Sequence, residues 1–252
     1  LSRRNFVKAA GVGGIGALAT PLIAARGSEA LTAVWAEPGF YPGAVLTAAS
    51  EERLAYRTRF ADAVRLDSNE NPNGPGARAL EAVRAMFTEA NRYPDVQEDD
   101  LVSAVAAHQK VKTDNVLVSC GSGEILRSAC YAFTGPGKAL VTALPSFETP
   151  VGFAQFLGAD VRQVPVDGNL KLDLARMLDQ VSVNGANAGL VFLCNPNNPT
   201  ATVHGASVVK DFIAQVNRRA PECMILVDEA YHEYVGDPEY ATSIHLALEN
   251  PR

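Results

Sequence analysis

The chain has 252 residues, of which 47% are hydrophobic and 20% are charged, and its formal net charge is −6. A chain of this length and hydrophobicity can bury a sizeable core, which excludes a disordered protein. Its basic residues are scattered along an acidic chain, which excludes a general nucleic-acid-binding surface. The four cysteines show neither CxxC nor metal-type spacing, and three lie in or beside apolar runs, so we expect buried thiols rather than disulfides.

The first segment, residues 1–36, has the features of an export signal. Arg3 and Arg4 precede a weakly apolar, glycine-rich run that Pro21 interrupts. This arrangement resembles a twin-arginine signal, and the alternative is a basic helix start on a cytoplasmic protein. The run is too short for a stable membrane anchor, so we expect cleavage after Ala36 and export to the periplasm.

Helical and strand-like patterns alternate after a connecting arm at residues 37–65. The expected helices are 77–89, 99–108, 124–133, one ending at 157, 173–181 and 206–219. The expected strands are 115–119, 139–143, 161–166, 190–194 and 224–228. Strands separated by helices in this way predict an α/β fold, in which a mostly parallel sheet is covered by helices on both faces. We assign residues 66–252 to this one large domain.

Three of the expected strands end in residues that could bind a ligand. Asp228 closes the apolar run 224–228, an Asn-Pro-Asn-Asn-Pro-Thr loop at 195–200 follows the preceding strand, and Gly-Ser-Gly at 121–123 opens a helix. The carboxyl ends of parallel strands share one edge of the sheet, where α/β proteins bind their ligands. We therefore expect these residues to meet in one crevice.

Each feature also has a simpler explanation when it is taken alone. Asp228 is equally suited to cap a helix, and a Gly-Ser-Gly sequence is common in tight turns. Glu229 and His232, with Asp228 and Glu233, have a weak likeness to a metal site, but the other histidines show no matching spacing. Surface positions explain Glu229 and His232, and no metal is expected.

The ordered set of motifs resembles the fold type I aminotransferases that use pyridoxal phosphate, most closely the histidinol-phosphate aminotransferase-like branch. The resemblance covers residues 66–234. It rests on Asp-Ser-Asn-Glu-Asn-Pro at 67–72, Arg-Tyr-Pro at 92–94, Gly-Ser-Gly-Glu at 121–124, the loop at 195–200 and Asp-Glu-Ala-Tyr at 228–231. It implies transfer of an amino group between an amino acid or amino-phosphate and a 2-oxo acid.

The resemblance implies roles for four residues around the cofactor ring. Asp228 would keep the ring nitrogen protonated through a charge-assisted hydrogen bond. Asn195 and Tyr231 would donate hydrogen bonds to the phenolic oxygen. Phe147 would stack on the ring, at a position where many relatives have tyrosine.

The resemblance implies roles for four further residues at the cofactor phosphate. Ser122, Gly123 and the backbone amide of Glu124 would hold the phosphate at the start of a helix. Tyr93 would reach the phosphate of the neighbouring subunit. That role requires a homodimer with a shared active site.

The lysine that forms the Schiff base in this family follows the next strand, and the last lysine of this chain is Lys210. By resemblance we expect the catalytic lysine beyond Arg252, with the small C-terminal domain that grips the substrate carboxylate. The chain is then the front portion of an aminotransferase, inactive by itself. Two alternatives stay open: a non-catalytic ligand-binding pseudoenzyme, and a pyridoxal-phosphate-dependent decarboxylase of a phosphorylated amino acid.

Overall fold

The computed structural model describes residues 69–252, which divide into a helical unit at 69–118 and a sheet unit at 119–252. The expected export signal at 1–36 and the connecting arm at 37–65 lie outside the described residues, so they stay predictions. Within residues 69–252, no helix has both the length and the apolar character that crossing a bilayer requires.

The helical unit is built from two helices, each followed by a short 3-10 turn. Its elements are α5 (Ala77–Ala85), η3 (Met86–Glu89), α6 (Asp95–Gln109) and η4 (Thr113–Asn115). Helix α6 begins at Asp95, directly after Pro94, rather than at residue 99 as predicted. Asp95 and Glu98 lie in its first turn, where negative charge interacts favourably with the helix dipole.

The predicted strand at residues 115–119 is wrong. Thr113–Asn115 forms a 3-10 turn, and Val116 after it is extended, with φ −119° and ψ 128°. A strand needs a neighbour for its backbone hydrogen bonds, and no described segment pairs with residues 116–119. The run therefore follows Val116 in an extended conformation without belonging to the sheet.

The sheet unit contains a four-stranded parallel sheet with a short antiparallel addition. Strand β1 pairs in parallel with β2 and β4, and β4 also pairs in parallel with β5. Strand β3 pairs antiparallel with the beginning of β4. The strands are β1 (Ala139–Leu144), β2 (Val161–Pro165), β3 (Ser182–Val183), β4 (Ala186–Cys194) and β5 (Met224–Asp228).

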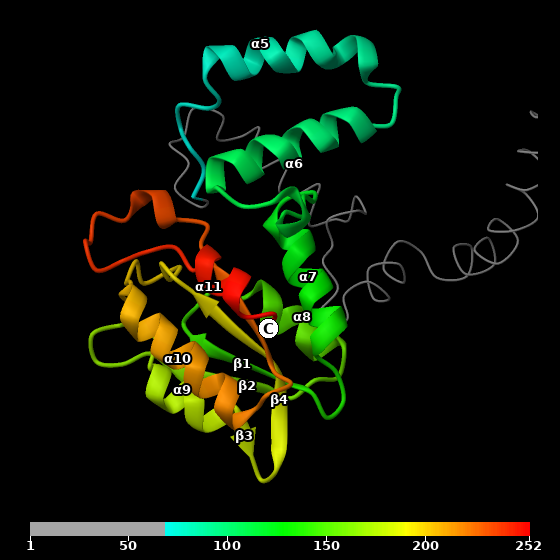
Figure 1. Cartoon of the computed structure of the whole chain (residues 1–252). Helices are drawn as coiled ribbons and strands as arrows, with labels where there is room; N and C mark the ends of the chain where they lie inside the picture. The colour runs from blue at the N-terminus through cyan, green and yellow to red at the C-terminus, as the bar shows by residue number, and fades with distance from the viewer. Residues whose placement is uncertain (1–68) are drawn as a thin grey trace, which may run out of the picture. The chain divides into compact units, whose positions relative to one another are not determined.

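Helices cover both faces of this sheet, as the sequence predicts (Figure 1). The helices of the unit are α7 (Ser122–Phe133), α8 (Thr149–Phe156), α9 (Leu174–Gln180), α10 (Ala206–Arg219) and α11 (Ile244–Glu249). Helices α7 and α8 pack on one face, against Leu190 and Phe192 of β4. Helices α9 and α10 pack on the other, against Val191 and Leu193, because successive side chains of a strand point to opposite faces. We call these the α7–α8 face and the α9–α10 face.

Several predictions for this unit agree with the structure. Helix α10 and strand β5 have the predicted bounds. Cys130, Cys194 and Cys223 are buried thiols, whereas Cys120 is exposed, so the expectation of buried thiols without disulfides is confirmed. Helix α7 begins at Ser122 rather than at residue 124, which brings the Gly-Ser-Gly sequence into the helix start.

The antiparallel hairpin of β3 and β4 was not predicted, although its turn has a clear sequence signal. Asn184 and Gly185 connect the strands with φ values of 52° and 78°. A two-residue hairpin turn with both φ values positive favours Asn-Gly. Because of this hairpin, β4 begins at Ala186 rather than at residue 190.

A bulge in β4 explains the glycine at position 189. Ala139 pairs with Ala188 and Leu140 pairs with Leu190, so Gly189 is an extra residue in the ladder. A Cβ atom at Gly189 would lie 1.9 Å from the carbonyl oxygen of Phe133 at the end of α7. Only glycine lets the strand and the helix end approach this closely.

Candidate functional site

The carboxyl ends of β1, β4 and β5 lie side by side at one edge of the sheet. The pairing of β4 with β5 places Cys194 opposite Asp228, the last residue of each strand. The backbone amide of Asn195 then donates to the carbonyl of Asp228 at 2.9 Å, which extends the ladder by one bond. Two of the predicted cofactor ligands are therefore neighbours.

The side chain of Asp228 is a half-buried carboxylate on the α7–α8 face. Strand alternation places it on the same face as Met224 and Leu226, which pack with α7 and α8. Burial is the main cause that raises the pKa of Asp228, and the negative charge of nearby Glu229 raises it further. The backbone amide of Ala230, which donates to Oδ1 at 3.1 Å, acts in the opposite direction and lowers the pKa. A carboxylate in this setting is stabilised by a cationic hydrogen-bond donor.

The thiol of Cys194 lies where the loop after β1, the loop after β4 and the end of β5 come together. Burial is the main reason that its pKa is raised to about 11. The backbone amides of Phe147 and Asn198 act on the same thiol in the opposite direction, and the charge of Asp228 raises the pKa further. Residues that follow β1 and β4 thus lie at this sulfur atom, and the last residue of β5 is close enough to influence its charge. The ring of Phe147 packs against the core of the α7–α8 face, the face that also carries Asp228.

Asn197 fastens the loop after β4 to the loop after β1. Its Nδ2 donates to the carbonyl of Pro145 at 3.1 Å and to Oγ1 of Thr200 at 2.8 Å. Its Oδ1 accepts from the hydroxyl of Ser146 at 2.8 Å. The Asn-Pro-Asn-Asn-Pro-Thr loop is therefore held by side-chain amides as well as by its two prolines.

Asn195 is only 1% exposed, and its polar atoms are held by several partners. Its Nδ2 donates to the carbonyl of His204 at 3.1 Å, and its Oδ1 accepts from the amide of His204 at 2.8 Å. Its carbonyl accepts from the hydroxyl of Tyr240 at 3.4 Å. The side-chain nitrogen carries two hydrogens, so one remains available for a further acceptor.

The Gly-Ser-Gly sequence forms the start of α7. Gly121 precedes the helix with φ 78°, a conformation that favours glycine. The described residues provide no hydrogen-bond acceptor for the amides of Ser122 and Gly123, whereas the Glu124 amide donates to the Gly121 carbonyl at 3.2 Å. The Glu124 carboxylate accepts from the Cys120 amide at 2.7 Å. Two free amides at a helix start suit an anion, while the Glu124 amide is already engaged.

The predicted residues Tyr231 and Tyr93 lie in different units. Tyr231 is half-buried and directly precedes η5 (His232–Tyr234), three residues after Asp228. Tyr93 lies in the helical unit between η3 and α6 and is 89% exposed. Its predicted role toward a neighbouring subunit stays a prediction.

Glu229 has a structural role that sequence reasoning missed. Its carboxylate accepts from the hydroxyl of Thr242 at 2.5 Å and from the amide of Ser243 at 2.6 Å. It therefore holds the segment that leads into α11, so the interpretation of Glu229 as a surface residue is wrong. No short-range pattern could have revealed these bonds, because the partners are 13 and 14 residues away.

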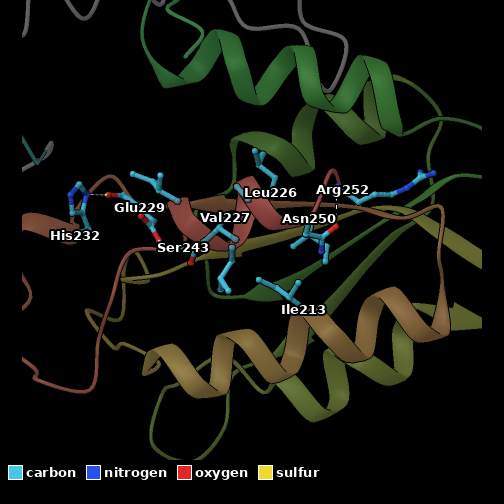
Figure 2. A pocket seen from close by; sticks show the side chains of 12 residues that line it. Ile213, Leu226, Val227, Glu229, His232, Ser243, Asn250 and Arg252 are labelled. Carbon is cyan, nitrogen blue, oxygen red and sulfur yellow. Dashed lines mark hydrogen bonds between the residues drawn. The ribbon is translucent and has the colours of Figure 1, made fainter. Parts of the chain in front are cut away.

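An apolar hollow of about 480 Å³ lies between β5, α10 and α11. Figure 2 shows Ile213 and Val227 around it, together with Glu229 and Asn250. Asp228 does not line this hollow. The strand ends offer the polar groups that a charged ligand needs, so we place the candidate site there. Residues 69–252 contain no group of three or more His, Cys, Asp or Glu side chains arranged to hold a metal ion.

Comparison with known proteins identifies similar sequences over most of the chain. Residues 61–251 match the family described as aminotransferase class I and II. A histidinol-phosphate aminotransferase of Moorella thermoacetica is 36% identical over 183 residues, which cover 73% of this chain and 46% of that protein. One of Bacillus cereus is 35% identical over 183 residues, covering 73% and 48%. The chain thus spans about half the length of these curated relatives.

Solved structures show the same fold. A protein from Erwinia carotovora atroseptica named as a histidinol-phosphate aminotransferase superposes with a TM-score of 0.68 at 32% identity, covering 74% of this chain and 53% of that one. The histidinol-phosphate aminotransferase of Sinorhizobium meliloti, solved with pyridoxal-5'-phosphate, gives 0.62 at 26% identity, covering 69% and 45%.

Proposed function

Since this chain belongs to the aminotransferase class I and II family, we propose that it forms the cofactor-binding part of a pyridoxal-phosphate-dependent aminotransferase. The whole protein transfers an amino group between an amino acid or amino-phosphate and a 2-oxo acid. The observation that carries this proposal is the meeting of Asp228, Asn195 and Phe147 at the carboxyl ends of three parallel strands.

The site fits the charge distribution of the cofactor. Half-buried Asp228 would pair with the protonated ring nitrogen, which relieves the cost of burying a carboxylate. The free amides of Ser122 and Gly123 would hold the phosphate, supported by the dipole of α7. When bound, pyridoxal phosphate supplies an electron sink for the bonding electrons of the substrate's α-carbon.

Three further residues orient the ring in this proposal. The second hydrogen on Nδ2 of Asn195 would be donated to the phenolic oxygen, together with the hydroxyl of Tyr231. Phe147 contributes an apolar ring on the face that carries Asp228, which suits stacking against an aromatic ligand. In this proposal Asp228 holds the ring nitrogen, Asn195 and Tyr231 hold the phenolic oxygen, and Phe147 contacts the face of the ring.

Binding of pyridoxamine phosphate to the 252-residue chain tests the proposal. This form of the cofactor has an amine in place of the aldehyde, so it does not attach to surface lysines. We expect Asp228→Ala to weaken binding by about 10- to 100-fold, because a hydrogen bond to a charged group contributes about 1.5–3 kcal/mol. Asp179→Ala, at an exposed carboxylate paired with Arg219, is the control and should bind normally. Absence of binding by the unmodified chain would refute the proposal.

A homodimer is part of the same proposal. Leu80, Val83 and Phe87 follow one side of α5 and continue into η3, and all three are exposed, Phe87 by 68%. Apolar side chains at this spacing suit packing against another helix, and a second copy of the chain would cover them. Sedimentation analysis should show a dimer that Phe87→Glu weakens, while Thr88→Glu beside it has a smaller effect. A monomeric unmodified chain would contradict this.

We also propose export through the twin-arginine pathway. The support is the sequence of residues 1–36, with its paired arginines before a weakly apolar run. Replacement of Arg3 and Arg4 by lysine preserves the charge and should abolish export of a fused reporter. Export that persists in this double variant would remove the support.

A further inference from the structure

The clamp that holds the side chain of Asn195 lies outside the Asn-Pro-Asn-Asn-Pro-Thr loop. The amide of His204 can only donate, so the atom of Asn195 that faces it must be the oxygen Oδ1. The neighbouring carbonyl of His204 can only accept, so it must face Nδ2. The backbone of His204 thereby fixes which end of the amide is the donor and where its second hydrogen lies.

The imidazole of His204 anchors this backbone to a neighbouring segment. Its Nε2 lies 3.0 Å from the carbonyl oxygen of Leu172, just before α9. A carbonyl oxygen only accepts, so Nε2 carries the hydrogen. Burial lowers the pKa of His204, which favours the neutral ring at physiological pH.

Leu172, whose carbonyl accepts the hydrogen bond from His204, is a buried residue of the core. Its side chain is 3% exposed and belongs to the core of the α9–α10 face. The hydroxyl of Thr202 makes a second bond to the same segment, at 2.9 Å from the carbonyl of Leu170. The segment that follows the loop is thus hydrogen-bonded to residues 170–172 on one side and to Asn195 on the other.

We propose that His204 is a positioning residue for the cofactor: its ring, held by Leu172, keeps its own backbone where it aims Asn195 at the phenolic oxygen. This inference rests on the function proposed above. The backbone bonds could form with any residue except proline at position 204. What the imidazole adds is a fixed location for that backbone.

Two ligands that differ in one oxygen can distinguish a role of His204 in positioning Asn195 from a role in the stability of the fold. Pyridoxamine phosphate carries the phenolic oxygen, and its 3-deoxy analogue does not. Asn195 can contact only the first, so the unmodified chain should prefer it by about tenfold, as expected for one hydrogen bond to a charged oxygen. If His204 acts through Asn195, His204→Leu should remove the part of this preference that Asn195 provides, leaving the part that Tyr231 provides, and should leave the affinity for the analogue almost unchanged.

Two other variants complete the design. His204→Gln retains an N–H donor near the position of Nε2 and should keep most of the preference. His245→Leu replaces an exposed histidine on α11 and should behave like the unmodified chain. Thermal unfolding is recorded for each variant. If His204→Leu does not fold, His204→Gln and His204→Asn are compared, since the shorter asparagine should show the reduced preference.

The outcomes distinguish the two proposals. If the unmodified chain binds neither ligand, or binds both equally, the proposed cofactor site is wrong and the role of His204 falls with it. If the unmodified chain prefers the hydroxylated ligand and His204→Leu keeps that preference, or weakens both ligands equally, only the positioning role is refuted. A preference that is reduced in His204→Leu and recovered in His204→Gln supports it.

Discussion

The backbone amide of Asn195 donates to the carbonyl of Asp228 across 2.9 Å, so the donor and the carboxylate predicted to hold one ring are joined by a ladder bond. Backbone pairing of this kind fixes the relative positions of two strand ends more firmly than contacts between flexible side chains. Substitutions that disturb either strand end are therefore expected to affect both residues.

Asp228→Asn should weaken ligand binding while it stabilises the free protein. Burial raises the pKa of Asp228 in the folded state, so its contribution to stability is complete at low pH and is lost as the pH rises through the raised pKa. The amide does not ionise, so the variant escapes this loss. Thermal unfolding followed from pH 3 to pH 8 should show a smaller decrease for the variant. Parallel curves for the two proteins would contradict the prediction.

Asn197→Ala should lower the free energy of unfolding by about 3 kcal/mol, because it removes three hydrogen bonds of a buried side chain to two loops. Ser146→Ala removes one of these bonds and should cost about 1 kcal/mol. Urea unfolding of both variants and the double variant measures the coupling between the two loops. Strictly additive costs would show that the loops are not joined through this pair.

Thr142→Val should raise the free energy of unfolding by about 1 kcal/mol. The hydroxyl of Thr142 is buried in β1, and no residue of 69–252 forms a hydrogen bond with it. Valine keeps the shape and removes the cost of burying this group. Thr142→Ser is the matched control, because it keeps the hydroxyl and loses a methyl group; it should be less stable than the unmodified chain. A destabilised Thr142→Val would indicate a partner for the hydroxyl.

Gly189→Ala and Gly152→Ala should have opposite effects. At Gly189 the new Cβ would collide with the carbonyl of Phe133, and backbone must move, so we expect a loss of about 3 kcal/mol. Gly152 lies within α8 with open space around its Cβ position, so alanine should gain about 0.5–1 kcal/mol from helix propensity. Chemical denaturation of both variants tests this, and similar stabilities would argue against the close approach at the bulge.

Thiol labelling at pH 8 should find one reactive cysteine in the folded chain. Cys120 is exposed, whereas burial raises the pKa of Cys130 and Cys194 to about 11 and that of Cys223 to about 12. The reactive species is the thiolate, so the buried three should react only after unfolding. Cys120→Ser should remove the fast phase, and a fast phase that remains in this variant would contradict the burial of the others.

The sheet and its coverings could be predicted because their signals are local. Helix α10 and strand β5 have the predicted bounds, since an amphipathic helix and an apolar run between polar residues are recognisable from the chain itself. The meeting of the ends of β4 and β5 was also expected, because parallel strands share one carboxyl edge. Gly-Ser-Gly at 121–123, the third member of the expected group, does not follow a strand of this sheet. The cofactor-binding roles of the eight residues stay predictions.

What could not be predicted depends on partners distant in sequence. Residues 116–119 have the composition of a strand, yet pairing, which composition does not specify, decides whether a strand forms. The bonds of Glu229 to Thr242 and Ser243 and the anchor of His204 on Leu172 arise only when separate segments fold together. The β3 hairpin is a different case, because Asn184-Gly185 is a local turn signal contained in the sequence itself.

Because the predicted ligand-binding residues and the α9–α10 core lie on opposite faces of the sheet, substitutions could change thermal stability without changing ligand affinity. Asp228 and Phe147 belong to the α7–α8 face, whereas the core around Val209, Phe212 and Val216 lies on the opposite side. Directed evolution could therefore introduce larger or better-fitting side chains beneath α10 with little change in how the chain holds its ligand. Substitutions that move the carbonyl of Leu172 are the exception. This carbonyl is bonded to His204, and the backbone of His204 is bonded to Asn195, so such substitutions should also change ligand affinity.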